Sequence, residues 1–237
     1  MKFTLIKLAA ACAALLWAFA VTADDAPRIG YVRPLVGTDG FGNVYPGAQV
    51  PFGGIQISPD TDDDYYDAAS GYKYAHKTLM GFSLNHLSGT GIPDLGDFLF
   101  MPGVGEIKLE PGTHDDPDAG YRSRYSHDEE WCSPAYYGVN LTDYGVKAEM
   151  TAAQRSGILR FTFPESDESG VVIDAFDRGS QVKVMPDSRT VVGYTTRNSG
   201  GVPDNFRNWF VIRFDKPFSG FRVFNGKNEL KGFEAEG

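Results

Sequence analysis

Seven short runs of β-branched and aromatic residues follow one another from Val146 onward, and they constrain the fold more than any other feature. Gly, Pro, Asp and Ser separate the runs, and no stretch shows a sustained apolar period of about 3.6 residues. This pattern predicts an all-β fold, an antiparallel β-sandwich. In the last run, Asn225-Gly226 predicts a type I′ hairpin turn, which needs positive φ at both central residues. The runs are VKAEMTA, GILRFTFP, GVVIDAF, SQVKVMP, TVVGYTT, NWFVIRFDKPF and FRVFNGKNELKGFE.

The first half of the chain has a different character. Residues 30–135 are crowded with Gly, Pro, Asp and Tyr, which break the segment into strands too short to fill the space between them. Long loops in a compact domain are usually binding or contact surfaces. We therefore expect a sandwich with long loops, and we expect its functional residues in this half.

The N-terminus has the three parts of a secretory signal. Lys2 and Lys7 supply a basic start, an apolar stretch covers Leu8–Val21, and Val21-Thr22-Ala23 is a small-residue cleavage site. We predict that residues 1–23 are a signal peptide and that residues 24–237 form one β-sandwich domain, exported to the periplasm or secreted. The apolar stretch is shorter than the ~20 residues of a spanning helix, so no transmembrane segment is expected after cleavage. An uncleaved membrane anchor is the alternative.

The charge balance narrows the range of partners. Without the signal, 20 basic and 31 acidic residues remain, a net charge of −11. A chain with this negative charge is not expected to bind nucleic acid. An exported domain rich in aromatic residues is better suited to neutral ligands such as sugars. Cys132 is the only cysteine outside the signal, which excludes an internal disulfide and a cysteine-based metal site.

Two sets of polar residues can be tested against known metal sites. In DTDDDYYD, three aspartates occupy calcium-loop positions, but Tyr65 replaces the required glycine and Gly71 the required glutamate. This excludes an EF-hand and favours a solvated acidic loop, with a weaker oxygen-ligated cation site as the alternative. Zinc binding would need several histidines to converge, and their scattered positions do not predict a metal site. They are His76, His86, His114 and His127.

Ordered sequence blocks across the mature chain resemble the N-terminal domain of glycoside hydrolase family 92. The resemblance extends from about Ile29 to Phe218 and implies a supersandwich of the galactose-mutarotase type. In that family the sandwich is joined through helical linkers to an (α/α) barrel. The blocks are YPGAQVPFGGIQISPD, SGYKY, GFSLNHLSGTG, DLGDFLFMP, YRSRYSHDEE, PAYYGVNLTDYGVKAEMTAAQRSGILRFTFP and FDKPF.

The resemblance implies an exported exo-acting α-mannosidase, often α-1,2-specific, that removes mannose from N-glycans or mannan with inversion. Calcium is the implied cofactor, binding the mannose O2 and O3 hydroxyls, while one carboxylic acid protonates the leaving oxygen and a carboxylate activates water. These groups belong to the C-terminal catalytic barrel of the same polypeptide. Because the 237-residue chain does not contain the barrel, we expect it to be a truncated and inactive part of the enzyme.

The resemblance also implies a set of substrate-binding residues in this domain. Tyr65-Tyr66-Asp67 stands where many members have Gly-Trp-Asp. Tyr66 would therefore stack on a sugar, and Asp67 would accept a hydrogen bond from a sugar hydroxyl. Near Ser88-Gly89-Thr90-Gly91, His86, Asp94 and Asp97 would position the loop or meet the sugar. The alternative is that they only brace the interdomain surface. Spacing does not establish a catalytic separation between Asp94 and Asp97, so no catalytic residue is assigned.

Two other hypotheses belong to different classes of protein. One is a stand-alone carbohydrate-binding module, whose stacking platforms would have to be exposed. The other is a structural remnant that folds without a ligand. The aromatic residues on which the module hypothesis depends are Tyr65, Tyr66, Tyr72, Tyr74 and Trp131.

Overall fold

The computed structural model describes residues 28–62, 68–89, 98–175, 179–198 and 202–236. The chain divides into two compact units, Met1–Arg33 and Pro34–Gly237. In the first unit, the described residues contain one short 3₁₀ helix, η1 (Arg28–Tyr31). Among the described residues, no helix is long and apolar enough to cross a membrane.

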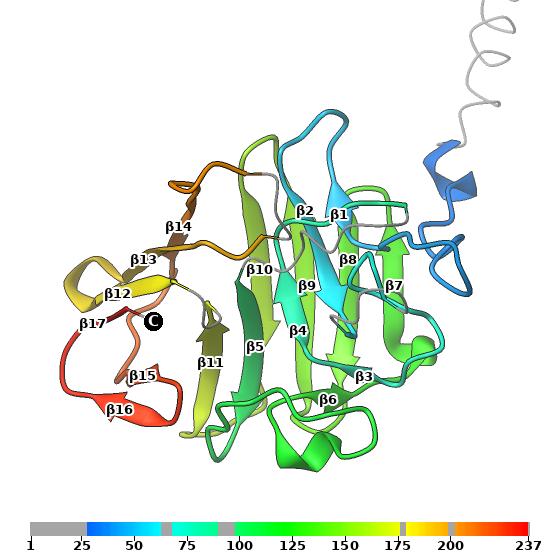
Figure 1. Ribbon diagram of the computed structural model, residues 1–237. Helices are drawn as coiled ribbons and strands as arrows, with labels where there is room; N and C mark the ends of the chain where they lie inside the picture. The colour runs from blue at the N-terminus through cyan, green and yellow to red at the C-terminus, as the bar shows by residue number, and fades with distance from the viewer. Residues whose placement is uncertain (1–27, 63–67, 90–97, 176–178, 199–201, 237) are drawn as a thin grey trace, which may run out of the picture. The chain divides into compact units, whose positions relative to one another are not determined.

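Two antiparallel sheets of the second unit pack face to face (Figure 1). Side chains from both sheets form one core, in which Phe82 and Leu99 of one sheet meet Tyr137 and Val139 of the other. The first sheet has the order β1 (Ala48–Gln49), β2 (Gln56–Asp60), β4 (Gly81–Ser83), β5 (Leu99–Val104) and β11 (Ser169–Asp174). The second has the order β10 (Gly157–Thr162), β9 (Val146–Ala152), β8 (Tyr136–Leu141) and β7 (Glu130–Ser133). The predicted antiparallel β-sandwich is therefore confirmed.

A third antiparallel sheet forms a second core beside β5 and β11. Phe98 and Phe100 pack there with Val191 and Phe210, and the rings of Phe98 and Phe210 are 4.3 Å apart. The sheet has the order β14 (Asn208–Arg213), β13 (Thr190–Thr195), β12 (Gln181–Met185) and β17 (Glu234–Glu236). The remaining elements are the strand pairs β15 (Val223–Asn225) with β16 (Asn228–Leu230) and β3 (Thr78–Leu79) with β6 (Ser123–Arg124), and the 3₁₀ helices η2 (Pro117–Ala119), η3 (His127–Glu129) and η4 (Pro186–Ser188).

The predicted strands of the second half are all present, but the last hairpin turns one residue later than predicted. Asn225 pairs with Asn228, so Gly226 and Lys227 are the two central residues of the turn. Gly226 has a φ of 55°, whereas neither Asn225 nor Lys227 has a positive φ. The type I′ prediction is therefore wrong, and one positive φ at the first central residue is the property of a type II′ turn. The Asn225 side chain donates to the carbonyl of Glu236, which helps to keep Asn225 in the strand.

One carboxylate interrupts the polar and apolar alternation of β9. Glu149 is buried although it lies between the inward-facing Ala148 and Met150. Its Oε1 atom accepts from the Tyr136 hydroxyl at 2.8 Å, and its Oε2 atom accepts from Arg160 Nε at 2.9 Å. The hydrogen bond from Tyr136, followed by that from Arg160, lowers the pKa of Glu149 despite the opposing effect of desolvation. These contacts join strands β8, β9 and β10.

Glu149→Gln should therefore destabilise the fold in a pH-dependent way. A carboxyl group whose pKa is lowered on folding stabilises the native state above its ordinary value of 4.5, and this contribution is lost as the pH falls through the folded pKa. We expect a loss of about 1 kcal/mol at neutral pH that shrinks below pH ~4. Urea unfolding across this range measures it. The exposed Glu165→Gln is the control, and a loss that does not change with pH would contradict the assignment.

Candidate functional site

Of the substrate-binding residues predicted from the sequence, His86 alone is described by the structure. Tyr66 and Asp67 lie outside the described residues, as do Asp94 and Asp97. The part played by these four side chains therefore stays a prediction.

His86 lies in the loop that follows β4, and its side chain is buried. Its Nδ1 atom is 2.7 Å from the carbonyl oxygen of Gln56, and its Nε2 atom is 2.7 Å from Asp60 Oδ1. Because a backbone carbonyl only accepts hydrogen bonds, Nδ1 donates to Gln56, and Nε2 forms a buried hydrogen bond with the Asp60 carboxyl group that is an ion pair when His86 is protonated. This geometry fastens the loop to β2, and it supports the bracing alternative for His86.

Gly71 lies directly against His86 and Asp60, where a larger residue would not fit. A Cβ atom at this position would lie 2.3 Å from Asp60 Oδ1 and 3.0 Å from the His86 ring, and its φ is 84°. Gly89, in the small-residue run after His86, has a φ of 112° but open space around a Cβ. The backbone conformation at position 89 therefore favours glycine.

The aromatic residues of the module hypothesis have unequal exposures. Tyr72 is only 2% exposed, so the prediction that it serves as a stacking platform is wrong. The Tyr74 ring is covered on one face by the His127 ring, with centroids 3.8 Å apart and planes 5° apart. Trp131 is 43% exposed, and the Lys147 ammonium lies 5.5 Å from the centre of its ring. Two exposed rings remain among the described members of this set.

Beneath Tyr74 lies a buried carboxylate network that the sequence did not predict. The Glu130 side chain is fully buried, and its Oε1 atom accepts from the hydroxyls of Tyr137 at 2.6 Å and Tyr72 at 2.8 Å. Its Oε2 atom is 2.7 Å from His127 Nδ1. Burial, and then the Glu130 charge, raise the pKa of Tyr137 well above its ordinary value, so this hydroxyl stays a donor. The network anchors η3 and β7 to the core.

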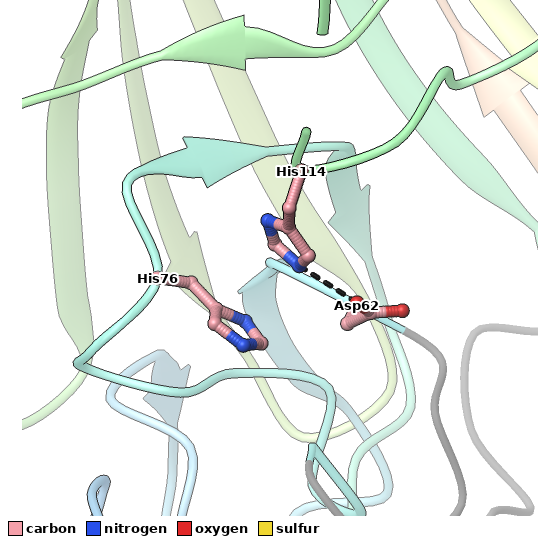
Figure 2. Close-up of side chains that lie close together, drawn as sticks. All are labelled: Asp62, His76 and His114. Carbon is pink, nitrogen blue, oxygen red and sulfur yellow. Dashed lines mark ion pairs between the residues drawn. The ribbon is translucent and has the colours of Figure 1, made fainter. Parts of the chain in front are cut away.

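The second polar cluster brings together two of the histidines that are scattered in the sequence. Figure 2 shows His76 and His114 reaching toward Asp62 from separate segments. One ligand-type atom from each residue lies within 4.8 Å of the other two. His114 Nε2 is 2.7 Å from Asp62 Oδ2, and the two rings are 4.0 Å apart. Sequence spacing contains no signal for this group, because each residue comes from a different loop.

Buried polar groups hold the His114 side of the cluster. The His114 Nδ1 atom is 2.9 Å from the Thr78 hydroxyl and 3.2 Å from Arg122 Nη1. Burial, then the positive charge of Arg122, then His76 lower the pKa of His114, and together they outweigh the opposing effect of Asp62. The imidazole of His114 is therefore neutral at physiological pH, the form in which it can act as a metal ligand.

A large recess of about 2120 Å³ borders the cluster, with Asp62, His114 and Arg122 in its wall. Residues of β10, β11 and β14 contribute to its lining, and Phe161 and Phe214 are examples of its apolar side chains. Two members of the polar cluster, Asp62 and His114, therefore border the recess.

Solved structures that share this fold place the chain among the β-sandwich domains of glycoside hydrolases. A family GH92 alpha-mannosidase of Bacteroides thetaiotaomicron, solved also in complex with mannoimidazole, matches 88% of this chain with 57% identity and a TM-score of 0.79. A family GH92 inverting mannosidase of the same species matches 91% of this chain with 29% identity and a TM-score of 0.76. An uncharacterized secreted glycosidase of Arthroderma benhamiae is 30% identical over 141 residues, which is 58% of this chain.

The chain belongs to glycosyl hydrolase family 92, because its residues 31–237 match the N-terminal domain of that family. The family resemblance read from the sequence blocks is therefore confirmed. The chain spans 30% and 29% of the length of the two bacterial mannosidases, and 17% of the length of the secreted glycosidase.

Proposed function

We propose that this chain is the N-terminal, cleft-forming domain of an exported, inverting exo-α-mannosidase that acts on N-glycans or mannan. The observation that carries the proposal is the 57% identity to an alpha-mannosidase of the same family across 88% of the chain. The relative described as an inverting mannosidase supports inversion, and the secreted glycosidase and the predicted signal at residues 1–23 support export.

In this proposal the calcium ligands belong to the catalytic barrel and not to the sandwich. Calcium takes about 6–8 oxygen ligands. Among the residues that the structure describes, the single His, Asp or Glu group able to hold an ion is Asp62, His76 and His114, in which two of three ligands are nitrogens. That group fits calcium poorly, and we propose that the calcium ligands lie in the catalytic barrel. When bound, calcium would polarise the mannose O2 and O3 hydroxyls.

Under this proposal the sandwich shapes the cleft and supplies no acid or base. The buried hydrogen bond between His86 and Asp60 holds the loop after β4 in position, so that the neighbouring segments can meet a sugar and the barrel. In glycoside hydrolysis with inversion, the carboxylic acid and the carboxylate lie about 6.5–9.5 Å apart. We place both in the C-terminal domain.

The isolated chain should release no mannose from aryl α-mannosides or from yeast mannan, with or without calcium. A polypeptide in which this chain is joined to the proposed catalytic barrel should release it, lose activity in a calcium chelator, and yield the β-anomer first when the products are followed by proton NMR. Turnover by the isolated chain would overturn the placement of the acid and base. Appearance of the α-anomer first would overturn the inverting mechanism.

A further inference from the structure

Three loops from the first half of the chain meet at a nitrogen-rich cluster. We propose that Asp62, His76 and His114 bind one divalent transition-metal ion, and that zinc suits this ligand set best (Figure 2). This site is separate from the calcium of the proposed mannosidase, and the argument for it does not depend on that function.

The chemistry of the three ligands selects the class of metal. Two imidazoles and one carboxylate form a common protein ligand set for zinc, with bonds of about 2.0–2.2 Å. Around a tetrahedral ion, ligand atoms lie about 3.3 Å apart. The atoms here span from 2.7 Å, between His114 Nε2 and Asp62 Oδ2, to at most 4.8 Å. Small side-chain rotations would therefore bring all three to bonding distance, whereas calcium and magnesium prefer oxygen ligands.

The contacts behind the ligands match those of known metal sites. Metal-bound histidines usually use their second ring nitrogen to donate to a fixed acceptor, which orients the ring. His76 Nδ1 is 3.0 Å from the Thr61 hydroxyl, and His114 Nδ1 is 2.9 Å from the Thr78 hydroxyl. Both threonines are buried. Each histidine would then use Nε2 as its ligand atom.

The guanidinium of Arg122 is compatible with this arrangement. Its Nη1 atom carries two hydrogens, and it has two good acceptors in the Thr61 carbonyl oxygen at 2.7 Å and the Thr78 hydroxyl at 2.9 Å. The 3.2 Å contact with His114 Nδ1 therefore does not need a hydrogen from Arg122. The Nδ1 atom can keep its own hydrogen and donate it to Thr78, which leaves the Nε2 lone pair directed away from Arg122.

The His114 Nε2 atom supplies an independent indication of a ligand. This nitrogen is buried and lies 2.7 Å from Asp62 Oδ2, yet among the described residues it has no hydrogen-bond partner. A cation coordinated by both atoms would satisfy them together.

Binding would tie together three segments that share no strand pairing. Asp62 follows β2, His76 precedes β3, and His114 lies between β5 and η2. Three protein ligands leave a fourth position for water, and Asp62 and His114 line the recess from which an ion could enter. The expected effect is a metal clip that stabilises the loop-rich half of the domain.

Calorimetric titration of the purified chain, freed of metal and of any histidine tag, tests the proposal with zinc chloride alone. We expect one zinc per chain, and a melting temperature that rises by about 5–10 °C when free zinc is a hundredfold above the dissociation constant. Cobalt(II) should give the visible absorption of a tetrahedral site. Calcium chloride and magnesium chloride should give neither heat nor stabilisation.

Matched variants locate the ion. Loss of an outer partner alone weakens metal sites by about 10–100-fold, so His76→Ala and His114→Ala should each weaken zinc binding at least tenfold. His114→Gln keeps a side chain that can bond to Thr78, and serves if alanine unfolds the loop. His127→Gln, a histidine outside the cluster, should bind zinc normally. Absence of zinc binding at millimolar metal, or undiminished binding by the cluster variants, would overturn the proposal.

Discussion

Glu130→Ala is expected to lower the free energy of unfolding by about 3–5 kcal/mol, because the change leaves buried donors without their acceptor. The Glu130 carboxylate is fully buried and accepts from Tyr137, Tyr72 and His127. Each unsatisfied buried group costs about 1–3 kcal/mol, and a charged acceptor makes its bonds stronger than neutral ones. The network joins β7, β8 and the segment before β3, so its loss should loosen all three.

Urea denaturation of the variant and the parent chain measures this effect. Glu130→Gln should cost less, about 1–3 kcal/mol, because its amide oxygen still accepts from the two tyrosine hydroxyls. Glu129→Ala removes the exposed neighbouring carboxylate and should change the free energy of unfolding by less than ~0.5 kcal/mol. A cost below ~1 kcal/mol for Glu130→Ala would show that water satisfies the freed hydroxyls.

His86→Ala is expected to cost about 3 kcal/mol or more, since it leaves the buried Asp60 carboxyl group without its hydrogen-bonded partner. The second oxygen of Asp60, Oδ2, is buried and has no hydrogen-bond partner among the described residues. The first oxygen therefore depends on His86 for its compensation. The same variant should also release the loop after β4 from β2.

A double-mutant cycle separates this bracing role from contact with a sugar. If His86 and Asp60 act as one pair, the variant His86→Ala/Asp60→Ala should be much less destabilised than the sum of the single variants. Thermal unfolding of the four proteins provides the comparison. Additive losses would indicate that His86 does not act through Asp60, and would favour the substrate-binding hypothesis.

The strands of the second half could be predicted because strand periodicity is local. In β13, for example, Val191, Gly193 and Thr195 are buried and alternate with half-buried Thr190, Val192 and Tyr194, and the β-branched and aromatic residues of this run predict the strand from sequence. The position of the last turn was missed by one residue. The favoured dipeptide Asn225-Gly226 is present, but the pairing of Asn225 with Asn228 and its contact with Glu236 decide the register.

The burial of charged groups was not predictable by the same reasoning. Glu149 occupies a position of β9 that would be solvent-facing, and it is covered because Tyr136 and Arg160 reach it from neighbouring strands. Glu130 lies on the other, core-facing side of the same sheet, in register with Val139 and Ala148, and it accepts a hydrogen bond from Tyr72, which is distant in sequence. Their partners become known only when the strands are paired.

The sequence by itself determined the all-β class, the antiparallel strands after Val146 and membership of glycosyl hydrolase family 92, because these depend on local alternation and on ordered blocks. The tertiary structure alone decided that His86 is buried against Asp60 and that Asp62, His76 and His114 meet. Loops carry no periodic signal, and their side chains converge only after the sheets have fixed where each loop begins and ends.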